Sequence, residues 1–260
     1  INAEPFDSTY IAKPSATSLL KNANIYDGEG NEFFGYDLLI VNGKIEAIGL
    51  NLLSKANNTV EYDLEGMWVT PGIIDLHSHM GVYSAPGVKS SSDGNESTSP
   101  VTADVWAEHS VWTQDPQFSL ALQGGVTTFH VLPGSANLIG GRGTTFKNVQ
   151  SNTIQGMKFP DAPHSLKMAC GENPKRVYGS RRQAPSTRMG NIAGYRKAWI
   201  KASKYRQNMN TYESKSAEAK EIVSPPTRDL EMDTLAGVLN GEILVQNHCY
   251  RAEEMAMMID

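Results

Sequence analysis

The sequence predicts an α/β fold in which a small β subdomain precedes a series of alternating strands and helices. The front of the chain carries short strand patterns separated by tight turns, and a later apolar run ends in two histidines. Beyond it, helical and strand patterns alternate. We expect an arm over residues 1–15, the small β subdomain over 16–70 and the larger α/β unit over 71–260.

The composition is that of an ordinary globular protein. The 260 residues are 40% hydrophobic and 20% charged, as in most folded domains. The net charge of −5 gives no reason to expect a nucleic-acid partner, and no apolar run approaches the ~20 residues needed to cross a membrane. Cys170 and Cys249 each lie in or beside a predicted strand, close to a candidate ligand, so we expect neither to belong to a disulfide framework.

Both ends of the chain look cut. The chain starts at Ile1 without a signal segment and stops within an amphipathic helical pattern over residues 251–260, so we expect the front part of a longer protein. A cleaved signal peptide would place that protein in the periplasm or outside the cell, and without one it would be cytoplasmic. Both alternatives stay open, as does assembly into a homo-oligomer.

The front part reads as a small β subdomain. Strand patterns cover residues 19–26, 36–41, 44–48, 60–64 and 67–69. The pair Asn42-Gly43 supplies the two positive φ values of a type I′ turn, which predicts a hairpin between the second and third of these strands.

The chain is organised around the stretch Val69–Gly81, VTPGIIDLHSHMG. A turn signal precedes a buried strand over residues 73–79, and side chains alternate along a strand. His77 and His79 therefore share one face, with Cα atoms roughly 7 Å apart. Imidazoles at that spacing can reach one zinc ion, for which the Zn–N distance is about 2.0–2.1 Å. The alternative is two histidines that happen to lie near a strand end.

The rest of the chain alternates between the two kinds of pattern. Helical patterns cover residues 105–112, 117–123, 192–209 and 230–239. Strand patterns cover residues 126–132, 143–148, 165–170 and 243–248. Three further histidines, His109, His130 and His164, have no evident partner, and we expect them to be structural.

Three later side chains complete a candidate metal-ligand set with the histidine pair. Lys167 lies in the middle of an apolar strand, which is costly unless the lysine is paired or modified. Glu172 follows that strand, and His248 ends another. Imidazole nitrogens with an anionic oxygen suit Zn²⁺ or a similar divalent ion. A lysine ammonium has no lone pair, so Lys167 could serve only when neutral or converted to a carbamate.

Two loops carry candidate substrate contacts. The polar loop 84–102 follows the histidine strand at the end where barrel active sites are built, and a solvated loop is the alternative. The glycine-rich segment 133–143 follows the next strand and could aim backbone N–H groups at an anion or a carbonyl, although a tight turn alone is the more common explanation of such a segment. The candidate substrate-binding residues are Asp93, Asn95, Glu96, Ser135, Asn137 and Arg142.

Several stretches resemble the opening part of the amidohydrolase superfamily. They are NANIYDGEG, LLIVNGKIEAIG and VTPGIIDLHSHMG within residues 22–81. Later segments, GVTTFHVLPGSANLIGGRG, LKMACGENPKRVYG and TRMG, are similar to those of imidazolonepropionase-like and secreted prolidase-like members. The resemblance covers nearly the whole chain from about Ser18 onward.

The resemblance implies a (β/α)8 TIM-type barrel beside a small β-sandwich, with the barrel incomplete in this chain. It implies that His77, His79 and His248 bind one or two Zn²⁺ ions, or another divalent metal. A carboxylated lysine at Lys167, or alternatively Glu172, would bridge them. A further histidine on the sixth barrel strand and a catalytic aspartate on the eighth would lie beyond Asp260.

The function implied is hydrolysis of a C–N bond by a metal-activated water. The substrate would be a small molecule or a short peptide-like compound with an amide, cyclic amide or short peptide bond, as in an imidazolonepropionase or a prolidase. The alternative from another class is a non-catalytic domain of the same fold that binds a metal or a partner through the loop 84–102. We expect this chain alone to be an incomplete enzyme.

Overall fold

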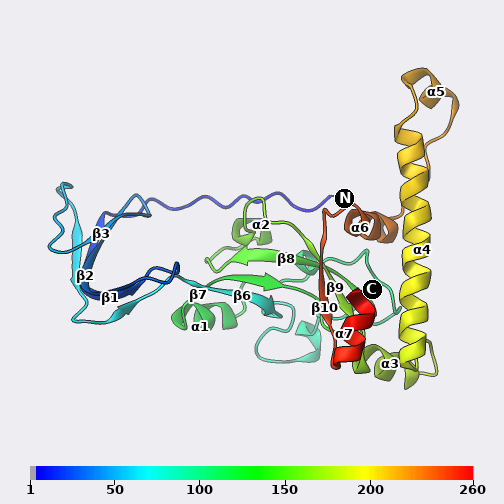
Figure 1. The fold of residues 1–260 in the computed structure, drawn as a ribbon, viewed down its shortest axis with the longest axis horizontal. Coiled ribbons are helices and arrows are strands. Elements are labelled where there is room, and N and C mark those ends of the chain that lie inside the picture. Colours follow the sequence, from blue (N-terminus) through cyan, green and yellow to red (C-terminus); the bar gives the residue numbers. More distant parts are fainter. Residues whose placement is uncertain (1–3, 260) are drawn as a thin grey trace. The chain divides into compact units, whose positions relative to one another are not determined.

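A computed structural model describes residues 4–259 and divides the chain into two compact units. One unit is Ile11–Ile73, and the other contains the described residues up to Tyr10 together with those from Ile74 onward. Figure 1 labels the helices and strands of each unit. The leading segment, expected as an arm, thus groups with the larger unit as far as Tyr10.

The smaller unit is a five-stranded sheet. Its strands are β1 (Ser18–Tyr26), β2 (Glu32–Val41), β3 (Lys44–Gly49), β4 (Val60–Asp63) and β5 (Trp68–Val69). The order is β3-β2-β1-β4, and β5 also pairs with β1. The hairpin prediction is confirmed, because Asn42 and Gly43 have φ values of 52° and 73°. All five strands belong to one sheet, so the subdomain expected as a β-sandwich has a single hydrogen-bonded layer.

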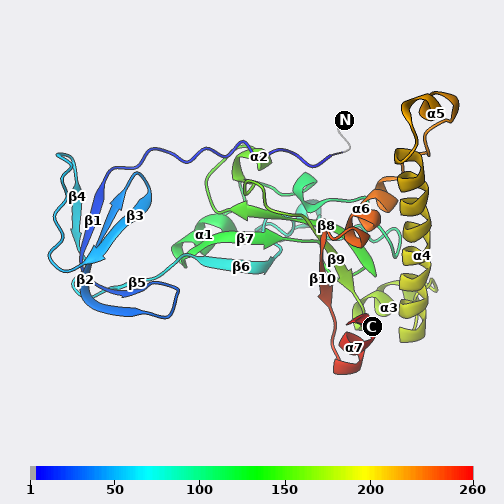
Figure 2. The same cartoon turned by 45° about the horizontal axis from the view of Figure 1, so that its top comes forward.

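The larger unit is built on a second five-stranded sheet. Its strands are β6 (Ile73–Ser78), β7 (Val126–Val131), β8 (Ile139–Lys147), β9 (Ser165–Ala169) and β10 (Leu244–His248), in the order β10-β9-β8-β7-β6. Figures 1 and 2 show that the sheet curls, so that β9 and β10 run across the direction of β6, β7 and β8. This is the expected partial barrel.

One strand departs from a regular (β/α)8 barrel. β9 and β10 are parallel, but β8 runs antiparallel to both β7 and β9. A parallel crossover needs a dozen or more residues, usually including a helix. The connection 132–138 between β7 and β8 is shorter than that, so β8 returns directly as a hairpin partner. β8 also begins four positions before the predicted strand 143–148.

Seven α-helices accompany this sheet in the described part of the chain. They are α1 (Gln117–Gln123), α2 (Ile154–Met157), α3 (Glu172–Gly179), α4 (Arg188–Glu213), α5 (Ala217–Ile222), α6 (Leu230–Leu239) and α7 (Ala252–Ile259). All but α5, which lies at the far end of α4 (Figure 1), have buried residues. One hydrophobic group includes Phe118 of α1 with Phe129 and Phe146 of the sheet. A second includes Leu166 of β9, Tyr195 of α4 and Leu235 of α6. None of the helices in residues 4–259 has the length and hydropathy required to cross a lipid bilayer.

Helix caps explain two of the helix starts. The Thr187 hydroxyl accepts a hydrogen bond from Gly190 N, and α4 accordingly begins four residues before the predicted helix 192–209. The Asp229 carboxylate accepts hydrogen bonds from Glu231 N and Met232 N. That cap fixes the start of α6, whose prediction over 230–239 is confirmed.

The prediction of a helix over residues 105–112 is wrong. Only a short 3₁₀ helix, η2 (Ala107–His109), forms there. The backbone of the segment bonds to β8 instead: Arg142 N donates to Val105 O at 2.8 Å, and Trp106 forms a bridge with Arg142. Tertiary pairing with the neighbouring strand therefore overrides the local helical pattern. The loop 84–102 is mainly irregular, with one 3₁₀ turn, η1 (Lys89–Ser91).

A buried ion pair anchors the leading segment. Glu108 is fully buried, and its carboxylate accepts from Lys158 Nζ at 2.6 Å. The same two side chains also bind the backbone of Phe6. Phe6 N donates to the Glu108 carboxylate at 3.0 Å, and Lys158 Nζ donates to Phe6 O at 2.6 Å. A buried ion pair is tolerable when further hydrogen bonds satisfy both charges, and Phe6 supplies them.

His130 of β7 is buried in the larger unit. Its Nδ1 lies 2.9 Å from Thr145 Oγ1, and its Nε2 lies 2.6 Å from Ser165 Oγ. Burial lowers the pKa of His130 to about 4. The ring is therefore neutral at pH 7 and fully hydrogen-bonded, which agrees with the structural role expected for it.

Acidification should destabilise the fold through His130. Its folded-state pKa of about 4 lies below the ordinary value, so the unfolded chain takes up the proton first as the pH falls. The stability is present above about pH 6.5 and is lost between there and pH 4. We expect His130→Asn to reduce the loss of unfolding free energy between pH 7 and pH 5 by about 2 kcal/mol. Urea denaturation of both proteins at both pH values measures this, and an unchanged pH dependence would contradict it.

A substitution that leaves a cavity can test the contribution of the core between the sheet and α6 to stability. Leu235 is fully buried, so Leu235→Ala should lower the free energy of unfolding by about 2–5 kcal/mol. Leu120→Ala is the matched control, because that side chain is 65% exposed and its truncation should cost at most about 0.5 kcal/mol. Denaturant unfolding measures both, and equal losses would contradict the assignment of the core.

Candidate metal site

The histidine pair lies at the end of β6. The strand was predicted to be buried, but most of its residues are exposed in the structure, including Ile74 and Leu76. The ring centroids of His77 and His79 are 5.1 Å apart. His79 Nδ1 lies 2.8 Å from the carbonyl oxygen of Leu132, so the N–H of a neutral ring sits on Nδ1 and donates there. The Nε2 lone pair of His79 is then free to bind a metal.

The side chain of Lys167, on β9, reaches the histidine pair from across the sheet. The residue is 2% exposed, and its Nζ lies 3.4 Å from His77 Nε2. Two strands, β7 and β8, separate β6 from β9. In a flat sheet these strands would be about 14 Å apart, so the curl of the sheet is what brings the two side chains together.

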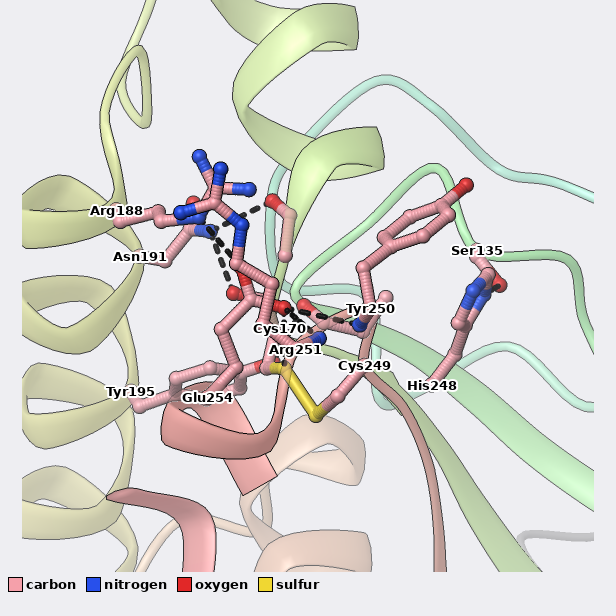
Figure 3. Close-up of a disulfide and its surroundings, with 12 residues drawn as sticks. Ser135, Cys170, Arg188, Asn191, Tyr195, His248, Cys249, Tyr250, Arg251 and Glu254 are labelled. Atoms are coloured by element: carbon pink, nitrogen blue, oxygen red, sulfur yellow. Dashed lines mark hydrogen bonds and ion pairs between the residues drawn. A yellow bond between two sulfur atoms is a disulfide. The ribbon is translucent and has the colours of Figure 1, made fainter. Parts of the chain in front are cut away.

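His248 ends β10, the strand next to β9. Its Nδ1 lies 2.5 Å from Ser135 Oγ, and Figure 3 shows the two side chains facing one another. The charge of Lys167 acts on both His248 and His77. With its Nδ1 hydrogen donated to Ser135, His248 would also keep Nε2 free.

The protonation states suit metal binding. Burial, and next the charge of Lys167, lower the pKa of His77 and of His248. Burial also lowers the pKa of His79, against the hydrogen bond to Leu132. Burial lowers the pKa of Lys167 to about 8, so about a tenth of the amine is neutral at pH 7. Neutral imidazoles beside an amine that can react are chemically consistent with a metal site built on a modified lysine.

The arrangement is not a metal site of histidines and carboxylates alone. Within residues 4–259, no group of three or more His, Cys, Asp or Glu side chains is placed to hold a metal ion. The set that the structure brings together consists of His77, His79 and Lys167, with His248 nearby. A lysine amine is not itself an anionic ligand, so the set is complete only if Lys167 is modified.

Glu172 is not brought to the histidines. It is the first residue of α3, and its carboxylate lies 3.4 Å from Arg188 and 4.0 Å from Lys175. Its side chain is therefore directed at surface cations. Of the two bridging ligands considered from the sequence, the geometry favours Lys167.

Of the six candidate substrate contacts, only Ser135 meets the histidine cluster. Asn95 instead bonds to Tyr83 Oη and accepts from Ala136 N. Asn137 is buried and donates to Glu96 O, Ser99 O and Thr102 Oγ1. These two amides hold the loops 84–102 and 133–143 together.

The other three candidates point elsewhere. Asp93 and Glu96 line a cavity of about 700 Å³, together with Trp106 and Trp112. The residues that line this cavity do not include any of the candidate metal ligands. Arg142 donates from Nε to Thr234 Oγ1 of α6 at 2.8 Å, so it is directed at the outer helix layer.

Two aromatic side chains near the histidines were not anticipated. The ring of Tyr83 lies 5.8 Å from that of His79, and the ring of Tyr250 lies 4.9 Å from that of His248. Tyr83 follows His79 by four residues and Tyr250 follows His248 by two. Proximity in sequence to each ligand was the available signal for both.

The expectation about the cysteines is wrong. Cys170 and Cys249 form a disulfide, with Cα atoms 5.2 Å apart, and Figure 3 shows it joining the ends of two strands. β9 and β10 are parallel, with Ala169 opposite His248, so the next residue of each strand is also adjacent. The strand pairing that places the cysteines together could not be read from their spacing in the sequence.

No protein-family model matches this chain. Amidohydrolase tasK of Hapsidospora irregularis is 31% identical over 278 residues, covering 96% of this chain and 28% of tasK. A dihydroorotase of Lactobacillus leichmannii is 45% identical over 69 residues, or 26% of this chain and 14% of that protein.

A solved structure shares the fold over almost the whole chain. The amidohydrolase from Thermotoga maritima MSB8 superposes with a TM-score of 0.83 at 38% identity, covering 93% of this chain and 60% of that one. This chain therefore spans less than two thirds of the length of either long relative. The two long matches, together with the paired histidines and the buried lysine, show that the chain belongs to the amidohydrolase superfamily.

Proposed function

We propose that the complete protein is a metal-dependent hydrolase of a C–N bond in an amide, a cyclic amide or a short peptide. The observation that carries the proposal is the contact of Lys167 with His77 inside the curled sheet, beside His79. Relatives named amidohydrolase and dihydroorotase support the reaction class. The proposed substrate is a small molecule or a short peptide-like compound.

His77, His79 and His248 would hold one or two divalent ions, with Zn²⁺ the best match to imidazole ligands. A bound ion of this kind activates water for attack on a carbonyl carbon. The hydrogen bonds of His79 to Leu132 O and of His248 to Ser135 would fix the ring tautomers that leave each Nε2 unprotonated. The aspartate expected beyond Asp260 would accept the proton of that water.

Lys167 would become the bridging ligand by carbamylation. Its neutral amine attacks CO₂ at carbon and loses a proton, which leaves a carbamate anion in place of a potential cation. The lowered pKa of Lys167, about 8, makes the neutral amine available near pH 7. The modification also replaces a buried positive charge with an anion, which the cations held by the three imidazoles would compensate.

A non-catalytic domain that binds a metal or a partner is the second candidate. One observation favours the partner-binding form of this candidate: in the described part of the chain, no three His, Cys, Asp or Glu side chains converge as a metal site. Metal-dependent hydrolysis separates the two candidates: a full-length protein with no bound metal and no metal-dependent activity would favour the non-catalytic domain.

Removing the histidine pair should abolish metal binding. We expect the full protein to hold about one or two zinc ions, and the double variant His77→Ala/His79→Ala to hold none tightly, because two of the ligands are lost. Plasma emission spectrometry after dialysis measures the stoichiometry. His109→Ala is the control, since that half-exposed histidine packs against Phe6 and Trp106. Unchanged zinc in the double variant would contradict the proposal.

The choice between Lys167 and Glu172 is also testable. In ¹³C-bicarbonate with zinc, the wild-type protein should show a carbamate carbon by ¹³C NMR, and Lys167→Ala should lack it and lose at least ten-fold in zinc affinity. Glu172→Gln should keep both the resonance and the affinity, because Glu172 contacts Arg188 instead. Loss of zinc in Glu172→Gln, with a normal Lys167→Ala, would reverse the assignment.

A further inference from the structure

A second cavity lies at the other end of the larger unit's strands. It has a volume of about 420 Å³, and its wall includes Glu4, Tyr205 of α4, Gly237 of α6 and Ile243. Arg142 and His164 also line it. His164 immediately precedes β9 and Ile243 immediately precedes β10, whereas Lys167 and His248 lie further along these strands. The cavity is therefore separate from the candidate metal site.

Arg142 brings a positive charge to this cavity without a carboxylate partner. Its guanidinium stacks 4.5 Å above the Trp106 ring, and its Nε donates to Thr234. No ion pair to Arg142 forms among residues 4–259. Burial lowers the pKa of Arg142, which is the expected cost of a cation held away from water. The terminal nitrogens of Arg142 are available to a bidentate anion.

His164 adds an unsatisfied donor beside it. The side chain is 8% exposed, and neither ring nitrogen has a hydrogen-bond partner in the described structure. Its ring lies 6.2 Å from the Trp106 ring, edge to face, so Arg142 and His164 pack on the same indole. Buried polar nitrogens normally have a hydrogen-bond partner. The His164 ring therefore has room for a polar group of a ligand bound in this cavity.

The carboxylates nearby are already engaged or exposed. Glu108 lies 3.6 Å from His164 Nε2, but it accepts hydrogen bonds from Lys158 and Phe6 N. Glu4 and Asp233 each lie 2.7 Å from Arg228, and Tyr205 donates to Asp233 at 2.5 Å. Glu242, also on the wall, is exposed to solvent, so its charge is screened. Glu4, Asp233 and Glu108 therefore act on Arg142 only at longer range, and none of them forms an ion pair with it.

We propose that this cavity binds a small molecule through a carboxylate or phosphate group, which Arg142 and an N–H of His164 recognise. A guanidinium holds either group by paired hydrogen bonds, and a neutral imidazole can donate one more. The volume exceeds that of a bare anion, and Pro5, Met209 and Ala236 on the wall suit an apolar remainder. The proposal does not depend on the metal site.

Thermal unfolding of the full protein tests the proposal. Inorganic phosphate and butanoate are titrated separately at constant ionic strength, with sodium chloride as the reference salt. A saturable rise in Tm with phosphate identifies the phosphate group, and one with butanoate identifies the carboxylate. The rise should persist in a chelator, because the cavity lies away from the candidate metal ligands. No saturable rise with either anion above chloride overturns the proposal.

Variants then locate the binding. Arg142→Gln should weaken the apparent affinity at least ten-fold, and Arg196→Gln, an exposed arginine of α4, should leave it unchanged. If Arg142→Gln does not fold, His164→Gln provides the test instead, and it should weaken the apparent affinity several-fold. Binding that both Arg142→Gln and His164→Gln retain at full strength also overturns the proposal.

Discussion

The curl of the larger sheet is the constraint on which the candidate site depends. Lys167 and His77 come from strands with two others between them, and yet their nitrogens are 3.4 Å apart. Only a strongly curved sheet can bring such side chains together on its concave side. The convex side is held by helix packing: Leu166 of β9 lies under α4 and α6, and Phe129 of β7 lies against α1. The hydrophobic packing outside therefore fixes the polar geometry inside.

The irregular strand β8 belongs to the same arrangement. By returning antiparallel to β7, it leaves no room for a helix between them, and the segment around Trp106 pairs with it instead. That segment carries Glu108 into the core, where Lys158 and the backbone of Phe6 satisfy it. This buried ion pair thereby helps to tie the leading residues to the larger unit, together with the Glu4–Arg228 ion pair and the hydrogen bond from Thr9 N to Gln155 O.

Local patterns were sufficient for most elements and for placing His77 and His79 together at a strand end. The extent of β6, the Asn42-Gly43 turn and the helical pattern of α6 are each written in a few adjacent residues. The helix predicted over 105–112 was wrong because its hydrogen bonds go to β8, far along the chain. The disulfide and the outward direction of Arg142 were likewise decided by strand pairing and helix packing. No local sequence pattern specifies these contacts, because each joins residues that lie far apart in the chain.

Buried cations connect the two proposed sites. Lys158 is buried and paired with Glu108, which is the ordinary way to make a buried charge tolerable. Lys167 is equally buried and faces an imidazole, and Arg142 is partly buried and faces an indole and a hydroxyl. Neither forms an ion pair among the described residues, although Lys158 shows that the fold can supply a carboxylate partner. Exceptions to charge pairing are expected where function requires them. A carbamate at Lys167 and a bound oxyanion at Arg142 would each provide the missing negative charge.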